Sequence, residues 1–157
     1  VEHRPGVLYN VANMFRCRGF NIESITVGPT VQKDLARITI MIKGDERTVE
    51  QVIKQLSKLI DVIKVSELDP SSTVVREMAL VKVHTPNAEK RSDVINYINV
   101  FRGRAVDVSP ESIVVEVTGS PDKIDAFINL MKAFGVKELA RTGITALSRG
   151  MKSVRIE

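Results

Sequence analysis

The sequence predicts an α+β fold made of two tandem βαββαβ modules, each a four-stranded antiparallel sheet with two helices on one face. Three observations lead to this prediction. Short segments of alternating polarity, typical of strands, take turns with longer segments whose apolar residues recur every three and four positions, typical of amphipathic helices. The second half of the chain repeats the order of the first at one offset. A Pro- and Ser-containing segment, residues 69–72, separates the halves.

The composition is that of an ordinary globular protein. The chain has 157 residues, of which 43% are hydrophobic, and a net charge of +4. This length suits one domain or two small ones. The single cysteine, Cys17, excludes an internal disulfide framework. No membrane span or signal peptide is visible, so we expect a cytoplasmic protein that binds neither a membrane nor, at this modest charge, nucleic acid.

The elements of the first half follow from its turns and its periodicity. A helix is predicted after the turn Arg4-Pro5-Gly6, and it ends at Gly19. Asp45 is a suitable N-cap for a second helix, whose apolar residues extend to Ile60. Strands are predicted over residues 20–27, 35–43 and 62–68. Alignment with the second half further predicts a first strand that precedes Val1.

The second half repeats the same plan after the linker, so we divide the chain into residues 1–69 and 70–157. Strands are predicted over residues 78–84, 105–108, 113–118 and 136–140. One helix follows the turn Thr85-Pro86-Asn87, and a second begins at Pro121, a residue suited to the first helical position. The tail is basic and carries Arg141, Arg149, Lys152 and Arg155. On charge alone, such a tail is a solvated surface.

The first helix and the strand after it suggest a small polar pocket. A helix that starts at a glycine turn presents backbone N–H groups that can hold a carboxylate. Asn21, beside the next strand, offers both a donor and an acceptor. This arrangement suits capture of a free amino acid, but it also suits a purely structural turn. Asn21 aligns with Ala105, and the second half lacks the Pro5-Gly6 pair, so we expect such a pocket only in the first half and partner binding in the second.

Other functions find less support in the residues. The two histidines and the one cysteine do not have metal-ligand spacing, and no nucleophile motif is present. An RNA-binding module of this plan needs aromatic residues on its central strands, and residues 35–43 and 113–118 contain none. A phosphatase of the acylphosphatase type would use Arg4 and Asn21, but the expected phosphate-cradling loop is missing.

Five segments, in order and with matching spacing, resemble the regulatory small subunit of acetolactate synthase (acetohydroxyacid synthase). They are PGVL, RGFNIESITV, QLSKLIDVIKVSEL, FRGRAVDVSPESIVVEVTG and ARTGITALSRG. The resemblance covers nearly the whole chain. It implies that residues 1–69 form an ACT domain, a ferredoxin-like module that binds amino acids, with its first strand truncated before Val1. Residues 70–157 would form a second ferredoxin-like domain with the basic tail.

The resemblance implies a non-catalytic regulatory subunit in the biosynthesis of branched-chain amino acids. Its partner would be the catalytic large subunit, a transferase that carries thiamine diphosphate, a divalent metal and a flavin, so we expect no cofactor on this chain. The small subunit would activate the large one and confer feedback inhibition by valine, leucine or isoleucine. The alternative is an ACT-type amino-acid sensor that serves a different enzyme.

The resemblance also implies where an effector binds, between the ACT domains of two paired subunits in a homodimer. Its carboxylate would meet the Pro-Gly turn, and its other polar atoms the start of the next strand. The expected effector-binding residues are His3, Pro5, Gly6, Val7, Leu8, Asn21 and Ile22. His3 departs from the family, because many relatives have Asn there, but its imidazole can still donate and accept hydrogen bonds. The basic tail becomes a candidate for docking on an acidic patch of the large subunit.

Overall fold

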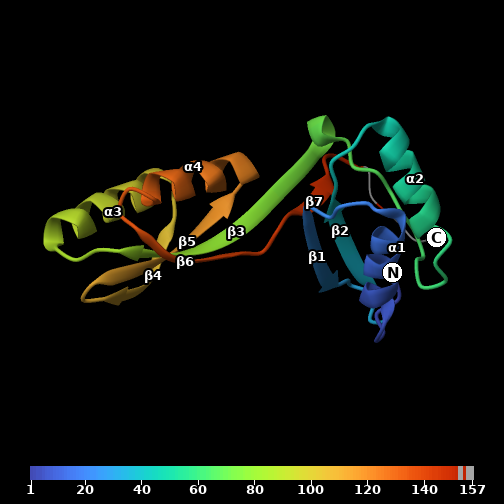
Figure 1. Ribbon diagram of the computed structural model, residues 1–157, viewed down its shortest axis with the longest axis horizontal. Helices are drawn as coiled ribbons and strands as arrows, with labels where there is room; N and C mark the ends of the chain where they lie inside the picture. The colour runs from blue at the N-terminus through green and yellow to red at the C-terminus, as the bar shows by residue number, and fades with distance from the viewer. Residues whose placement is uncertain (152–153, 155–157) are drawn as a thin grey trace. The chain divides into compact units, whose positions relative to one another are not determined.

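The computed structural model describes residues 1–151 and 154, which form two compact units (Figure 1). The first unit contains residues 1–74 and the described residues from Ile144 onward, and the second contains residues 75–143. The sequence-based division, by comparison, is at residue 69 and keeps the C-terminal segment with the second half. The predicted α+β class is confirmed, with four helices and antiparallel sheets among the described residues.

The helices of the first unit begin and end where local chemistry directs them. Helix α1 (Val7–Arg18) lies between Gly6 and Gly19, which have φ values of 90° and 70°. Glycine adopts such values without strain because it has no Cβ. Helix α2 (Glu46–Leu56) begins after Asp45, whose side chain accepts a hydrogen bond from the N–H of Thr48 at 2.9 Å. The predicted N-cap is therefore confirmed. The core between the helices contains Val11, Met14, Phe15, Val52 and Leu56.

Two strands of the first unit pair antiparallel, β1 (Ser24–Pro29) and β2 (Ala36–Met41). Strand β1 starts and ends later than predicted. Gly28 and Pro29, which lie beyond the predicted end of this strand, pair with Arg37 and Ala36. Proline has no backbone N–H to donate. As the last residue of the strand, Pro29 interrupts no hydrogen bond in the middle of the β1–β2 ladder.

The prediction of a strand over residues 62–68 is wrong, because the structure has no strand there. In the βαββαβ plan, this segment pairs with the first strand. Here the backbone N–H of Glu2 donates to the carbonyl of Asp61, the residue just before this segment, at 2.9 Å. Glu2 also forms an isolated bridge with Leu35. A segment whose neighbour contributes one residue cannot form a ladder.

An apolar groove of about 470 Å³ lies between β2 and the segment 62–68. Its lining includes Val11, Val52 and Leu56 from the helices. The second unit explains the position of this groove, because there β3 lies between β5 and β6, the counterparts of β2 and of residues 62–68. The groove therefore lies where the repeat places the first strand.

The second unit has the predicted four-stranded sheet, in the order β4-β5-β3-β6 with antiparallel neighbours. Its elements are β3 (Thr73–His84), α3 (Ala88–Val100), β4 (Arg104–Ser109), β5 (Ser112–Gly119), α4 (Pro121–Met131) and β6 (Val136–Arg141). Both helices lie along the same face of the sheet (Figure 1). Fully buried residues of β3 and β5 alternate with less buried ones, and Val81, Val115 and Phe127 belong to the core between the layers.

The two stretches of chain where one unit passes into the other differ from the prediction. The predicted linker forms a short 3-10 helix (Pro70–Ser72), and β3 follows it directly, five residues before the expected start. A further strand that the sequence analysis did not predict, β7 (Thr145–Ser148), pairs with β3. The N–H of Arg149 donates to the carbonyl of Ser72 at 2.7 Å.

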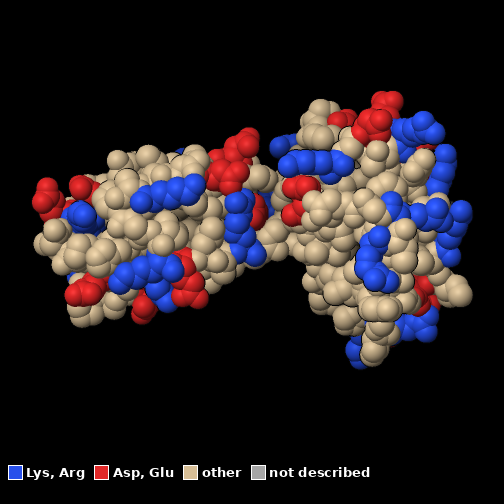
Figure 2. Space-filling view, viewed as in Figure 1, with Lys and Arg blue, Asp and Glu red and all other residues tan. Residues whose placement is uncertain are grey.

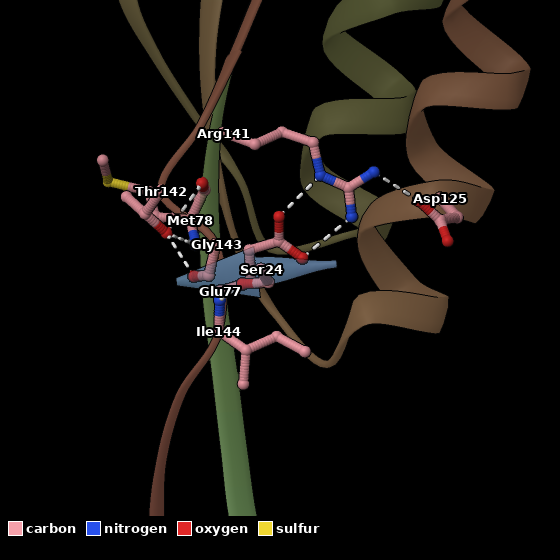
Figure 3. Close-up of polar contacts among 8 residues, drawn as sticks. All are labelled: Ser24, Glu77, Met78, Asp125, Arg141, Thr142, Gly143 and Ile144. Carbon is pink, nitrogen blue, oxygen red and sulfur yellow. Dashed lines mark hydrogen bonds and ion pairs between the residues drawn. The ribbon is translucent and has the colours of Figure 1, made fainter. Parts of the chain in front are cut away.

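The segment that contains β7 covers one face of the β1–β2 pair. The N–H of Ile144 donates to the hydroxyl of Ser24 at 2.8 Å, and Figure 3 includes both residues. The hydroxyl of Thr26 donates to the carbonyl of Ile144, also at 2.8 Å. Arg37 donates to the carbonyl of Ala146 at 3.0 Å. Ile144 and Ala146 are 8% and 6% exposed, so this segment is part of the first unit.

Candidate functional site

The turn before α1 exposes its backbone at the surface. Gly6 has φ 90° and ψ −19°, and a Cβ built at this position would meet no other atom within 4 Å. The next residue, Val7, is 4% exposed and anchors the helix in the core, whereas Leu8 is 48% exposed. The turn thus combines open space above the glycine with a fixed helix beneath it.

The start of α1 leaves backbone donors available. No side chain caps the helix, and its first backbone hydrogen bond runs from the N–H of Asn10 to the carbonyl of Gly6 at 3.0 Å. The N–H groups of Val7, Leu8 and Tyr9 therefore have no partner within the helix. Such groups, together with the positive end of the helix dipole, favour a carboxylate.

Asp61, which follows α2, holds both sides of this turn. Its carboxylate accepts a hydrogen bond from the side chain of Asn10 at 2.8 Å and another from Arg4. Arg4 also contacts Glu2, with 2.6 Å between Nε and Oε2. The hydrogen bonds from Asn10 and Arg4 keep the pKa of Asp61 below its ordinary value, so the side chain is a carboxylate at neutral pH.

Neither Asn10 nor Asp61 was among the residues expected from the sequence. Asn10 lies one helical turn after Gly6, and this spacing could have indicated that its side chain is near the turn. Asp61 is 55 positions further along the chain than Gly6, and no local pattern connects the two. Its position became clear only from the packing of the first unit.

Asn21 and Ile22 lie just before β1. The side-chain N–H of Asn21 donates to the carboxylate of Glu23 at 2.9 Å, and Lys43 lies 3.3 Å from the same carboxylate. The hydrogen bond from Asn21 and the contact with Lys43 lower the pKa of Glu23. Ile22 packs against the core that also contains Phe15 of α1. The amide oxygen of Asn21 has no partner among the described residues and can accept a hydrogen bond.

The other expected residues occupy the turn itself. His3 is exposed, and its backbone N–H donates to the backbone carbonyl of Asp34 at 2.7 Å. Pro5 is exposed and precedes Gly6 directly. No hydrogen bond or ion pair within the described part of the chain connects Asn21 with the turn, so the shared core of α1 and Ile22 fixes their separation.

Two family profiles match these same regions. The AHAS small subunit-like ACT domain matches residues 1–64, and the small subunit of acetolactate synthase matches residues 76–150. The chain is 58% identical to the probable acetolactate synthase small subunit of Methanothermobacter thermautotrophicus over 154 residues, which are 98% of this chain and 92% of that one. The chain belongs to the acetolactate synthase small-subunit family.

Other members of the family agree with this assignment. Over 151 residues the chain is 48% identical to the acetolactate synthase small subunit of Aquifex aeolicus, covering 96% of this chain and 79% of that one. The crystal structure of the small subunit from Thermotoga maritima superimposes with a TM-score of 0.89 at 47% identity, covering 96% and 93% of the two chains. The resemblance noted from the sequence is confirmed, and the ACT-domain match contains every expected effector residue.

The second unit of this small subunit lacks an open helix start at the equivalent position. The side chain of Asn87 accepts a hydrogen bond from the N–H of Lys90 at 2.9 Å and thereby caps α3. A backbone donor that is free in α1 is thus already bonded in α3. Ala105, which aligns with Asn21, has no polar side chain. The starts of α1 and α3 therefore differ in the backbone donors that they leave open.

The basic residues at the end of the chain have different surroundings. Arg141 is engaged within the second unit by Glu77 and Asp125 (Figure 3). Arg149 is exposed, and Lys152 and Arg155 lie outside the described residues. Figure 2 shows acidic and basic side chains interspersed over the second unit on the face that it presents. No single-sign patch covers the unit on that face.

Two further searches concern only residues 1–151 and 154. Among these residues, no group of three or more His, Cys, Asp or Glu side chains could hold a metal ion. None of the helices in this part of the chain is long and apolar enough to cross a membrane.

Proposed function

We propose that this small subunit is the non-catalytic regulatory subunit of a cytoplasmic acetolactate synthase. It binds the catalytic large subunit, raises its activity and makes it sensitive to valine, or to leucine or isoleucine. Thiamine diphosphate, a divalent metal and a flavin belong to the large subunit. The observation that carries the proposal is the uncapped start of α1 at Gly6, within the ACT-domain match.

The effector binds through the two charged groups that every free amino acid has. Its carboxylate accepts hydrogen bonds from the N–H groups that follow Gly6, where the helix dipole favours a negative charge. Its ammonium group donates to the amide oxygen of Asn21, whose N–H is already occupied by Glu23.

The effector site is completed by a second copy of the chain. Leu8 is 48% exposed and Tyr9 is 70% exposed, and both directly follow the turn. Large apolar side chains that are exposed together beside a polar site are typical of a surface covered by a partner. A homodimer through the ACT domains would bury them and enclose the apolar side chain of the effector.

Calorimetric titration of the isolated protein with valine, leucine and isoleucine tests this function, with light scattering of the same samples. We expect binding of at least one of the three amino acids, no binding of the deaminated analogue 3-methylbutanoate, and a dimer at micromolar concentration. If none of the three binds, the effector site is wrong. A monomer in the presence of bound effector would contradict the shared site.

A further inference from the structure

Asp61 connects three points of the N-terminal segment. Its carbonyl accepts a hydrogen bond from the N–H of Glu2 at 2.9 Å, and its carboxylate accepts hydrogen bonds from Arg4 and from Asn10. Arg4 precedes the turn and Asn10 lies one helical turn after it. The turn at Gly6 is therefore held from both sides by one residue that is distant in the sequence.

The burial and charge of Asp61 indicate that this arrangement is specific. The residue is 8% exposed, and a charged residue at that level of burial requires partners. Its two side-chain oxygens are each occupied, by Arg4 on one and by Asn10 on the other. The side chain of Arg4 is 55% exposed, so the pair is formed at the edge of the unit.

The choice of donors leaves the helix start free. Asp61 accepts from side chains, and its carboxylate has no hydrogen bond to the N–H groups of Val7, Leu8 or Tyr9. An acid at a helix start commonly caps these groups itself. Here the acid fixes the turn through two side chains and leaves the N–H groups of the first helical turn open, so that another carboxylate can bind them.

We propose that Asp61 is the positioning residue of the effector site: it holds the Arg4-Pro5-Gly6 turn so that the backbone donors of α1 face the effector carboxylate. This inference rests on the proposed function and identifies a residue that acts on the site through Arg4 and Asn10. Asp61 itself does not contact the effector.

The test compares Asp61→Asn and Arg4→Gln with Glu50→Gln, which removes a matched charge from an exposed pair with Lys54 on α2 (3.3 Å). Valine affinity is measured by calorimetry. We expect Asp61→Asn to weaken binding about tenfold, since a hydrogen bond to a charged group is commonly worth about that factor. Arg4→Gln should also weaken valine binding, and combining it with Asp61→Asn should add little to the effect of either change alone. Glu50→Gln should leave the affinity unchanged.

Hydrogen exchange of the amides of residues 6–9, without effector, gives a second measurement. In Asp61→Asn these amides should exchange faster than in the wild-type chain, while those in the middle of α2 should not. Arg4→Gln lies at the surface, so it reports on the pair even if Asp61→Asn fails to fold. Unchanged affinity and exchange in both variants would overturn the positioning role while wild-type binding persists. Failure of the wild-type chain to bind any branched-chain amino acid would overturn the proposed function as well.

Discussion

Glu77 is a buried acid in strand β3, and its surroundings show how a single residue stabilises the second unit. It is 5% exposed and accepts hydrogen bonds from Nε and Nη2 of Arg141 at 2.6 and 2.8 Å. The third nitrogen of Arg141 donates to Asp125 of α4 at 2.7 Å (Figure 3). The hydrogen bonds with Glu77 raise the pKa of Arg141 above its ordinary value. Glu77, Arg141 and Asp125 together connect β3, β6 and α4.

We predict that Glu77→Gln destabilises the second unit by about 2 kcal/mol, because it weakens the hydrogen bonds to a charged group and leaves Arg141 only the exposed carboxylate of Asp125 as an acidic partner. Glu138→Gln is the matched control, since Glu138 lies on the same strand as Arg141 and forms an exposed pair with Lys82 at 2.7 Å. Exposed pairs contribute little. Urea denaturation measures both variants, and equal stability of the two would contradict the structural role given to Glu77.

At the scale of elements, the sequence predicted those helices and strands whose signals are local. Asp45 caps α2, Pro121 occupies the first position of α4, and Gly19 ends α1, all as expected. These predictions succeeded because capping, turn chemistry and periodicity depend on neighbours along the chain. The prediction of a strand over residues 62–68 was wrong because a strand depends on a neighbouring strand, which the local sequence does not reveal.

Strand β7 was missed for the same reason. The segment ITALS has only short alternation, and its burial comes from the face of β1 and β2 that carries Ser24, Thr26 and Arg37. These side chains are polar, so apolar periodicity does not mark that face as one that another segment covers. In the structure they bind the backbone of the C-terminal segment, a use of polar side chains that hydrophobic patterning cannot detect.

We predict that truncation after Gly143 destabilises the first unit by about 3 kcal/mol, since it removes several hydrogen bonds and the burial of Ile144. Truncation after Met151 is the control, because it keeps β7. Hydrogen exchange of β1 and β2 measures the effect on this unit alone. Equal protection of these strands in both truncated chains would show that the segment contributes nothing to them. We therefore expect a separately produced first half to need the segment that begins at Ile144.

At the scale of the whole molecule, one plan occurs twice, and the two copies differ at the start of their first helices. Gly44 and Gly119 occupy equivalent positions just before the caps of α2 and α4, which supports the alignment of the halves. The starts of α1 and α3 differ, because Asn87 caps α3 whereas Gly6 leaves α1 open. The sequence predicted this asymmetry from Gly6 and Asn21, but the contribution of Asp61 required the folded chain.

The activity of the catalytic large subunit, measured with this chain and with or without valine, tests the central claim most directly. Gly6→Asp places a carboxylate at the proposed site of the effector carboxylate, and two like charges about 4 Å apart repel by about 4 kcal/mol near a protein surface. Gly6→Ala is the matched control, because it has the same backbone strain at φ 90° without the charge.

We predict that the wild-type chain and Gly6→Ala both raise the activity and make it sensitive to valine, whereas Gly6→Asp raises the activity without conferring valine sensitivity. If Gly6→Asp confers the same valine inhibition as the wild-type chain, the effector does not bind at the start of α1. If the wild-type chain neither activates the large subunit nor changes its response to valine, leucine or isoleucine, the regulatory function is contradicted.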